Sequence, residues 1–254
     1  ASEMKTPVVV KETEEEIPDA DILFRWGCRA KTNKNFSVTL NKAKSIELSA
    51  DKANARFFLA QHGVPTPFTT IFKDDVSFPG KWVVRPKRHQ DGSDFYVVTS
   101  NEELDKAIEL CGDQFYVSHL FPKNKEFRVV TFKGRVLFVI AKRPKTTNEN
   151  VWGMPEQTAT SIRWSEWPIY ACYQSVVATK VLGLDFSAVD VMTKGNYISI
   201  CEVNTAPGFL GKYRATCIAK AVDYHVENNS WDNIPASPTT WKTLIHPAIS
   251  EKAE

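Results

Sequence analysis

The hydrophobic positions along the chain fall into two repeating patterns. Short runs rich in Val, Ile, Phe and Tyr, either alternating with polar residues or continuous, predict strands. These runs cover residues 22–26, 81–85, 95–98, 115–120, 126–132, 135–142, 187–192 and 197–203. Turn residues at Lys133-Gly134 and at 193–196 join the last four runs into two antiparallel hairpins.

Apolar residues spaced three and four apart predict four helices. The helices cover residues 49–62, 100–111, 168–182 and 210–226. Ser49 and Ser100 are the expected N-caps of the first two, and Ser100 opens a capping box with Glu103. Hairpins combined with helices, without regular βαβ units, predict an α+β fold.

Three stretches lack either pattern. The first twenty residues are polar and acidic and predict a solvated leader. Residues 145–163 are long, polar and irregular, which is typical of a functional loop. The residues after 226 predict an extended tail that packs back through Trp231 and Trp241.

Composition excludes several classes of protein. The chain has 254 residues, 43% of them hydrophobic, with a formal net charge of +2, so nothing favours a nucleic-acid-binding protein on charge alone. Its five cysteines show no zinc-ligand spacing and are expected to be free thiols. No apolar run is long enough for a membrane span or a signal peptide, so we expect a cytoplasmic protein.

The most specific candidate for chemistry is the set Asp190, Glu202 and Asn204 on the second hairpin. Glu202 and Asn204 are two apart on a strand and therefore share a face. Asp190 joins them if the hairpin pairs residues whose numbers sum to an even value. Three oxygen ligands would then converge, as Mg²⁺ prefers. The alternative is three separately solvated residues, which the buried neighbours disfavour because an uncompensated buried carboxylate pair is costly.

Several cations form a second group of candidates. Lys52 stands in the first turn of its helix, where a positive charge opposes the helix dipole and favours an anionic partner such as phosphate. Others lie at the end of the 81–85 strand and on the first hairpin: Arg85, Lys87, Arg128, Lys142 and Arg143. Taken one by one, each is more simply explained as a surface charge. Together they could surround a triphosphate.

Four parts of the chain resemble the ATP-grasp carboxylate–amine ligases, most closely the ribosomal-protein glutamate ligase branch. They are residues 49–67, 126–128, 183–191 and 201–208, of which the Asp…Glu-Val-Asn-x-x-Pro-Gly piece is the most specific. The resemblance covers roughly residues 49–225. The compact chain is also similar to ATP-grasp proteins encoded by bacteriophages.

The resemblance implies an ATP-grasp fold in which two α+β lobes clasp ATP. The expected divisions are an acidic leader with a remnant of a truncated pre-grasp domain (1–48), a linker helix with the N-terminal lobe (49–120), the C-terminal lobe (121–226) and the tail (227–254).

The resemblance also implies roles for individual residues. Lys52 would reach the nucleotide phosphates, and Arg85, with Lys87 as compensation, would replace a second phosphate-binding lysine. Lys142 would belong to the same nucleotide site. Gly92 would belong to a lid over residues 89–93, and the hinge around adenine would include Ser118, His119 and Leu120. Arg128 would lie near the γ-phosphate, and Arg163 near the substrate or phosphate. Asp190, Glu202 and Asn204 would bind Mg²⁺.

The implied activity is ATP- and Mg²⁺-dependent formation of an amide or peptide bond through an acyl phosphate. The amine could belong to an amino acid, a peptide, a protein tail or a modified nucleobase. The single lid glycine and Arg85 depart from the pattern, which keeps open a non-catalytic module that binds ATP or a partner. The short front implies that another subunit, a partner or the tail completes the acceptor site.

Overall fold

The computed structural model describes residues 3–11, 17–88, 94–145, 148–153, 160–208, 211–231, 235–237 and 239–250. For residues 145, 148, 149 and 151–153 it describes the backbone only. No helix in these ranges combines the length and apolar character of a membrane span.

The described strands form three sheets. A four-stranded sheet has the order β3-β6-β4-β5, a five-stranded sheet the order β11-β10-β7-β8-β9, and β1 and β2 form a parallel pair. The strands are β1 Ile22–Phe24, β2 Val38–Leu40, β3 Thr69–Thr70, β4 Trp82–Pro86, β5 Tyr96–Val98, β6 Phe115–His119, β7 Lys125–Phe132, β8 Arg135–Lys145, β9 Asn148–Gly153, β10 Phe186–Lys194 and β11 Tyr197–Asn204.

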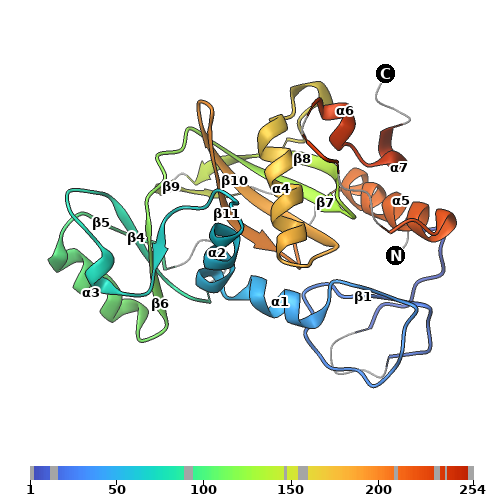
Figure 1. Ribbon diagram of the computed structural model, residues 1–254, viewed down its shortest axis with the longest axis horizontal. Coiled ribbons are helices and arrows are strands. Elements are labelled where there is room, and N and C mark those ends of the chain that lie inside the picture. The colour runs from blue at the N-terminus through green and yellow to red at the C-terminus, as the bar shows by residue number, and fades with distance from the viewer. Residues whose placement is uncertain are drawn as a thin grey trace.

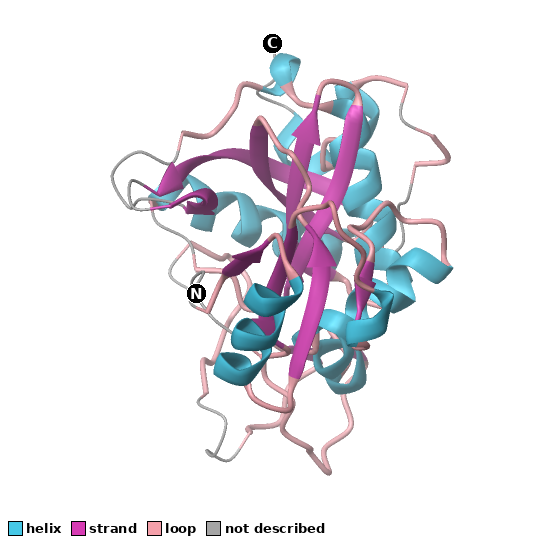
Figure 2. Cartoon of the chain, turned by 90° about the vertical axis from the view of Figure 1, so that its left-hand side faces the viewer, coloured by secondary structure: helices cyan, strands magenta, loops and turns pink. Residues whose placement is uncertain are grey.

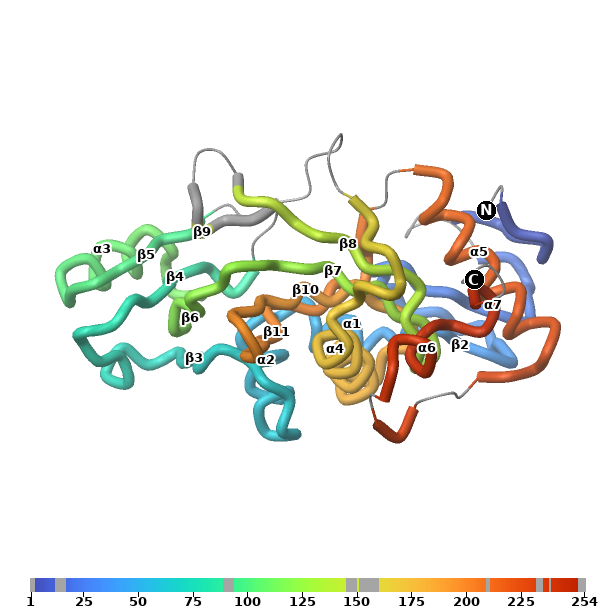
Figure 3. Tube along the Cα trace, turned by 90° about the horizontal axis from the view of Figure 1, so that it is seen from above, coloured from blue at the N-terminus to red at the C-terminus, as the bar shows by residue number. Residues whose placement is uncertain are grey.

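The helices cover these sheets. They are α1 Ala43–Ala50, α2 Lys52–Gln61, α3 Asn101–Cys111, α4 Ile169–Val181, α5 Lys212–Asn228, α6 Trp241–Leu244 and α7 Pro247–Ser250, with 3₁₀ turns at Lys73–Asp75 and Trp164–Glu166. The four-stranded sheet with α3 lies at one end of the long axis, and α5 and α7 lie at the other (Figures 1 and 3). The end that carries α3 faces the viewer in Figure 2.

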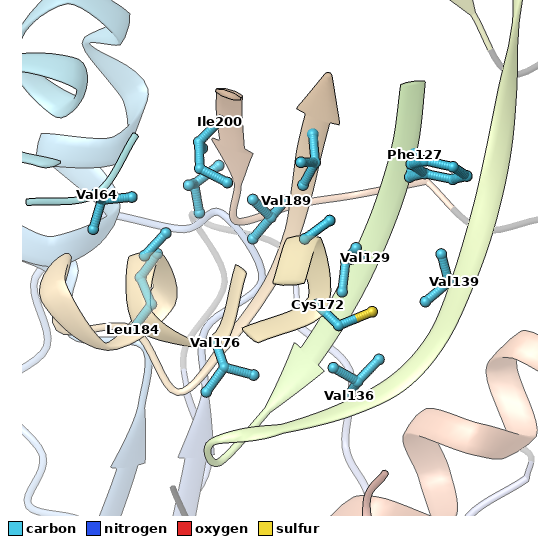
Figure 4. Close-up of a cluster of buried hydrophobic side chains, with 14 of the residues drawn as sticks. Val64, Phe127, Val129, Val136, Val139, Cys172, Val176, Leu184, Val189 and Ile200 are labelled. Carbon is cyan, nitrogen blue, oxygen red and sulfur yellow. The ribbon is translucent and has the colours of Figure 1, made fainter. Parts of the chain in front are cut away.

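The five-stranded sheet is buried on both faces over most of its length. One face packs against α4 through a cluster that includes Val129, Val189 and Val176 (Figure 4). The other packs against α5 through a second cluster, where Phe138 and Ala188 meet Ala221. Burial on both faces explains why these strands appear in the sequence as nearly continuous apolar runs.

The four-stranded sheet has a smaller core of its own. Trp82, Val84 and Val117 pack there against Leu104 and Ala107 of α3. Ser100 caps α3 as predicted, because its Oγ accepts from the Glu103 backbone N–H at 3.3 Å. The return bond of the capping box differs, since the Glu103 carboxylate accepts from the Thr99 N–H at 2.7 Å.

The helix predicted over residues 49–62 is in fact two helices that meet at Asp51. Asp51 caps α2 by accepting from the Asn54 N–H at 3.0 Å, so the assignment of Ser49 as the cap is wrong. Ser49 instead lies in the last turn of α1 and is 1% exposed. The cap therefore lies two residues later than predicted, and Ser49 is a buried residue of α1 instead.

The patternless stretches are more ordered than the sequence predicts. Part of the 145–163 loop is a strand, because β8 extends to Lys145 and pairs with β9. The leader is not fully solvated, since the backbone N–H groups of Lys5 and Thr6 donate to Asp223 at 2.9 and 3.0 Å. The acidic run 12–16 lies outside the described residues.

The tail packs back as predicted but is not simply extended. Trp231 stacks on His225, with ring centroids 5.5 Å apart, and Trp241 lies 6.4 Å from Trp164. The tail contains two short helices, α6 and α7, and Leu244 of α6 is fully buried.

His246 anchors this tail to β8 and to α5. His246 is fully buried, and its backbone N–H donates to the Val136 carbonyl at 2.9 Å. Its Nδ1 accepts from the Ala248 N–H at 3.2 Å, so Nε2 carries the proton and faces His225 Nε2 at 3.0 Å. Burial, His225 and Arg135 together lower the pKa of His246 to about 3.

The pKa of His246 predicts acid sensitivity. In the unfolded chain this histidine titrates near its ordinary value of about 6.5. Between pH 6.5 and 3 the unfolded state therefore binds a proton that the folded state does not, so stability falls as the pH falls. We expect the free energy of unfolding in urea to drop by roughly 2 kcal/mol from this residue between pH 7.5 and pH 5. The drop should shrink in His246→Leu but persist in His62→Leu, which alters an exposed histidine. Equal drops in both variants would contradict the assignment.

Candidate functional site

Charged side chains replace apolar ones at one end of the sheet face that α5 covers. Arg128 on β7 is the register partner of Asp190 on β10, which is in turn the partner of Glu202 on β11. Because side chains alternate along a strand, Arg128 and Asp190 lie on the same face as Val130 and Ala188, which belong to the core beneath α5. The same face therefore serves as core at one end and as a charged site at the other.

Asp190 is the centre of this site. Arg128 donates to it through two nitrogens, from Nε to Oδ1 at 2.7 Å and from Nη2 to Oδ2 at 2.9 Å. Lys142 Nζ donates to Oδ2 at 3.0 Å. The Asp190 side chain is only 2% exposed, and those of Arg128 and Lys142 are 13% and 8% exposed, so two largely buried cations hold one buried carboxylate.

These contacts fix the charge states. Burial opposes ionisation of Asp190, but Arg128 and Lys142 outweigh it and leave its pKa below the ordinary value. Burial likewise opposes the charge on Lys142, but Asp190 and Glu126 raise its pKa. Both groups are therefore ionised at neutral pH.

Glu126 extends the network toward the start of β7. It is 3% exposed and forms ion pairs with both Lys142 and Lys123. Lys142 therefore bridges Glu126 and Asp190, which are on neighbouring strands.

A β-bulge aligns Asp190 with Glu202. Near the turn, β10 and β11 pair residues such as Lys194 with Tyr197, and Val191 with Ile200. The register then shifts by one, leaving Cys201 without a partner and placing Glu202 opposite Asp190. Bulges are frequent beside active sites because they re-aim side chains in this way.

The helices α1 and α2 contact the outer side of β11 at the bulge. Ser49 Oγ donates to the Val203 carbonyl at 2.6 Å, and Arg56 Nε donates to the Cys201 carbonyl at 2.9 Å. Between them, Lys52 Nζ lies 3.8 Å from Glu202 Oε2. Glu202 also accepts from Asn204 Nδ2 at 2.8 Å.

A cavity of about 430 Å³ lies between the two larger sheets. Its lining includes four basic side chains, Arg56, Lys81, Arg85 and Lys123, and no carboxylate among the described residues. The other lining residues are Pro67, Val83, Phe95, Ser118, His119, Leu120, Phe121, Pro122, Asn150, Met192 and Cys201. A cavity lined by apolar and basic residues suits an anionic small molecule.

The structure brings most of the predicted site residues together. Arg85, Ser118, His119 and Leu120 line the cavity. Asp190, Glu202 and Asn204 lie beside it with Arg128, Lys142 and Lys52. Lys87 is near Lys52, because its carbonyl accepts from the Lys52 backbone N–H at 3.4 Å.

Two predicted residues stand apart. Gly92 and the rest of the 89–93 segment lie outside the described residues. Arg163 is exposed at the edge of the sheet, two residues beyond Ser161, which bridges to Ile140 on β8. Its predicted role in binding substrate or phosphate stays a prediction.

Several residues of the site were not predicted from the sequence. Arg56 and Cys201 line the cavity, and Glu126 and Lys123 belong to the ion-pair network. Arg56 carried a usable signal, because it lies four residues after Lys52 and therefore on the same helix face. Cys201 carried no local signal of this kind.

The oxygen donors fit a divalent cation. Asp190 and Glu202 are paired across the strands, and Asn204 contacts Glu202, so hard oxygen ligands of the kind Mg²⁺ prefers lie together. Within the described ranges, no three His, Cys, Asp or Glu side chains form a metal-binding cluster. A cation here would therefore rely on Asn204 and on oxygens from a ligand, which is how Mg²⁺ commonly binds with phosphates.

Comparison with known proteins rests on the fold. No family model and no curated protein matches the sequence. Among solved structures, the D-alanine–D-alanine ligase from Bacillus anthracis complexed with ATP is similar, with a TM-score of 0.55 and 20% identity over 74% of this chain. The ATP-grasp ligase PsnB, complexed with minimal precursor, Mg and ADP, has a TM-score of 0.54 and 15% identity over 72% of this chain.

The chain has the ATP-grasp fold. An L-amino acid ligase from Bacillus licheniformis is also similar, with a TM-score of 0.53 and 18% identity over 71% of this chain. The chain spans 66% of the ATP-bound D-alanine–D-alanine ligase, 61% of PsnB and 45% of the L-amino acid ligase. These ATP-grasp proteins are therefore longer, and identities this low show the fold and nothing finer.

Proposed function

We propose that this chain is an ATP- and Mg²⁺-dependent carboxylate–amine ligase. The observation that supports it most is the cavity between the two sheets, whose described lining carries basic side chains but no carboxylate. It borders the carboxylate pair Asp190 and Glu202 through Cys201. A nucleoside triphosphate with its metal ion needs this arrangement, because the phosphates require cations and the ion requires oxygen ligands.

The site residues would divide the work by charge. Arg85 and Lys52 would face the phosphates, with Ser118 to Leu120 and Met192 around the base. Glu202, Asn204 and Asp190 would hold Mg²⁺. The ion would supply charge neutralisation at the phosphates. Arg128 and Lys142, already fully charged and buried, would offset the charge of the transferred group without reorganisation.

The proposed reaction has two steps. A substrate carboxylate oxygen attacks the γ-phosphorus, giving an acyl phosphate and ADP. An amine nitrogen then attacks the acyl carbon, phosphate leaves, and the nitrogen loses a proton as the amide forms. This chain's contribution is to position both substrates and exclude water, because phosphoryl transfer needs little covalent help from side chains.

The substrates we propose are amino acids or peptides. D-alanine–D-alanine ligase and L-amino acid ligase are named for amino acid substrates, and PsnB was solved with a precursor peptide. We further propose that residues 49–120 and 121–226 act as the two clasping lobes, and that the preceding residues complete the acceptor side. Gly27 supports this, because a Cβ there would lie 2.5 Å from the Ala206 side chain in the loop that follows Asn204.

A thermal melt with ATP and Mg²⁺, combined with an ADP-release assay, tests the proposal. Ligand at about a hundred times its dissociation constant should add about 2.7 kcal/mol, a shift of several degrees. We expect the shift to depend on Mg²⁺ and to be lost in Glu202→Gln, which removes one charge at the metal site. Glu109→Gln, an exposed change on α3, is the matched control and should retain it.

Three possible outcomes distinguish the candidate functions. ADP release with a mixture of amino acids and peptides would support the ligase. A Mg²⁺-dependent shift without ADP release under any substrate mixture would favour a non-catalytic ATP-binding module. A wild-type protein with no shift at all would contradict both.

A further inference from the structure

One face of the α1–α2 corner holds three consecutive residues of β11. Ser49 binds the Val203 carbonyl, Lys52 faces the Glu202 carboxylate, and Arg56 binds the Cys201 carbonyl. Lys52 and Arg56 lie four residues apart on α2 and therefore share a face, and Ser49 comes from the last turn of α1. These three contacts hold β11 at its bulge.

The bulge needs such support. An extra residue in a ladder leaves its backbone groups without their usual strand partner, and buried backbone groups must be satisfied elsewhere. Arg56 meets this need for Cys201, because Nε donates to its carbonyl at 2.9 Å and Nη2 lies 3.8 Å from its Sγ. The guanidinium itself is held in place, since it is 7% exposed and its centre lies 5.2 Å from the Tyr116 ring.

The alignment of the metal ligands depends on this bulge. If the register of Lys194 with Tyr197 continued unchanged, Asp190 would pair with Cys201 instead of Glu202. The two carboxylates would then lie on opposite faces of the hairpin, because neighbouring side chains alternate. One unpaired residue thus decides whether Asp190 and Glu202 converge.

We propose that Arg56 is a positioning residue that stabilises the Cys201 bulge and thereby holds Glu202 opposite Asp190 for cation binding. This inference rests on the proposed function, and it gives Arg56 a task apart from its place in the cavity wall. Within the described residues Arg56 Nη1 has no hydrogen-bond partner, so Nη1 remains available to a ligand while Nε serves the bulge.

The two tasks of Arg56 can be separated by measuring metal and nucleotide binding independently. ADP affinity is measured by calorimetry in EDTA and again with saturating Mn²⁺. Mn²⁺ affinity for the protein–ADP complex is measured by electron paramagnetic resonance, which also reports the geometry of the bound ion. For Arg56→Met we expect Mn²⁺ affinity to fall about 10- to 100-fold, the usual effect of losing a group that orients metal ligands. ADP affinity in EDTA should change much less.

Three further variants sharpen the test. Lys44→Met removes one exposed charge from the same helix pair and should leave Mn²⁺ affinity unchanged. Arg56→Lys keeps the charge but cannot reproduce the Nε bond, so it should not restore Mn²⁺ affinity. Ser49→Ala removes the hydrogen bond to the Val203 carbonyl with little change in volume and should cause a smaller loss of Mn²⁺ affinity. It provides the test if Arg56→Met folds poorly.

Other outcomes would overturn the inference. Unchanged Mn²⁺ affinity in Arg56→Met would do so, as would an equal loss of ADP affinity with and without metal, which marks a direct phosphate ligand. A wild-type protein that binds ADP but no Mn²⁺ would also overturn it. If the wild type binds neither, the proposed function fails and this inference fails with it.

Discussion

Asp190→Ala is expected to lower the free energy of unfolding by about 3–5 kcal/mol. The substitution leaves Arg128 and Lys142 buried without their shared counter-ion, and breaking a buried pair from one side costs about this much. The Asp190 side chain is 2% exposed and that of Lys142 8%, so water cannot easily replace the lost carboxylate. Urea denaturation at pH 7.5 measures the change.

An exposed ion pair provides the control for this prediction. Lys34 Nζ lies 3.0 Å from Asp19, whose side chain is 97% exposed. Lys34→Ala should therefore cost less than about 1 kcal/mol, as is usual for surface pairs. A loss in Asp190→Ala no larger than that in Lys34→Ala would show that Arg128 and Lys142 find other partners and that Asp190 is not the centre of the network.

Asn41→Leu is expected to destabilise the fold by about 3 kcal/mol or more. Asn41 is fully buried between β2 and the start of β10, and its Oδ1 accepts from the N–H groups of Asp185 and Phe186 at 2.9 and 3.0 Å. Leucine would leave two buried donors unsatisfied, at about 1–3 kcal/mol each. The Asn41 backbone has a φ of 60°, which asparagine tolerates better than leucine.

Two substitutions test the cause of that loss. Asn41→Asp keeps the acceptor oxygen but loses the amide that donates to the Phe186 carbonyl at 2.9 Å, so it should also be destabilising in the same urea titration. Asn33→Leu, which changes an exposed asparagine in the same N-terminal region, should be nearly neutral. If Asn41→Leu is also nearly neutral, the N-terminal segment does not depend on this residue for its attachment to β10.

Elements with a strong local pattern were predicted well. The two central hairpins and α3, α4 and α5 were all identified from apolar periodicity, turn residues and caps, and the structure confirms them. Missed elements have weak local signals. β2 and β3 have three and two residues, and β9 lies in a polar stretch where pairing with β8, not its own pattern, makes it a strand.

The break between α1 and α2 shows a similar limit. The cap was predicted at Ser49, although Asp51, two residues later, is also a preferred N-cap residue type. Burial decides, because Ser49 is drawn into contact with β11 while Asp51 stays free to cap α2.

The sequence by itself determined which residue types could form a site. Residue chemistry and alternation are local properties, so they identify the candidates from the sequence. These candidates are the run Glu202-Val203-Asn204, Asp190, and the basic residues Lys52 and Arg128. It also determined the fold class, since hairpins and amphipathic helices follow from periodicity. These properties need no knowledge of what packs against what.

Only the tertiary structure decided how these residues meet. The one-residue bulge at Cys201 brings Glu202 opposite Asp190, and its support comes from Arg56, more than a hundred residues earlier in the chain. The pairing of Asp190 with two cations likewise joins three strands. A shift of one residue in a ladder costs little in local propensity but reverses every side chain beyond it. Its choice therefore falls to long-range contacts, which local sequence patterns do not record.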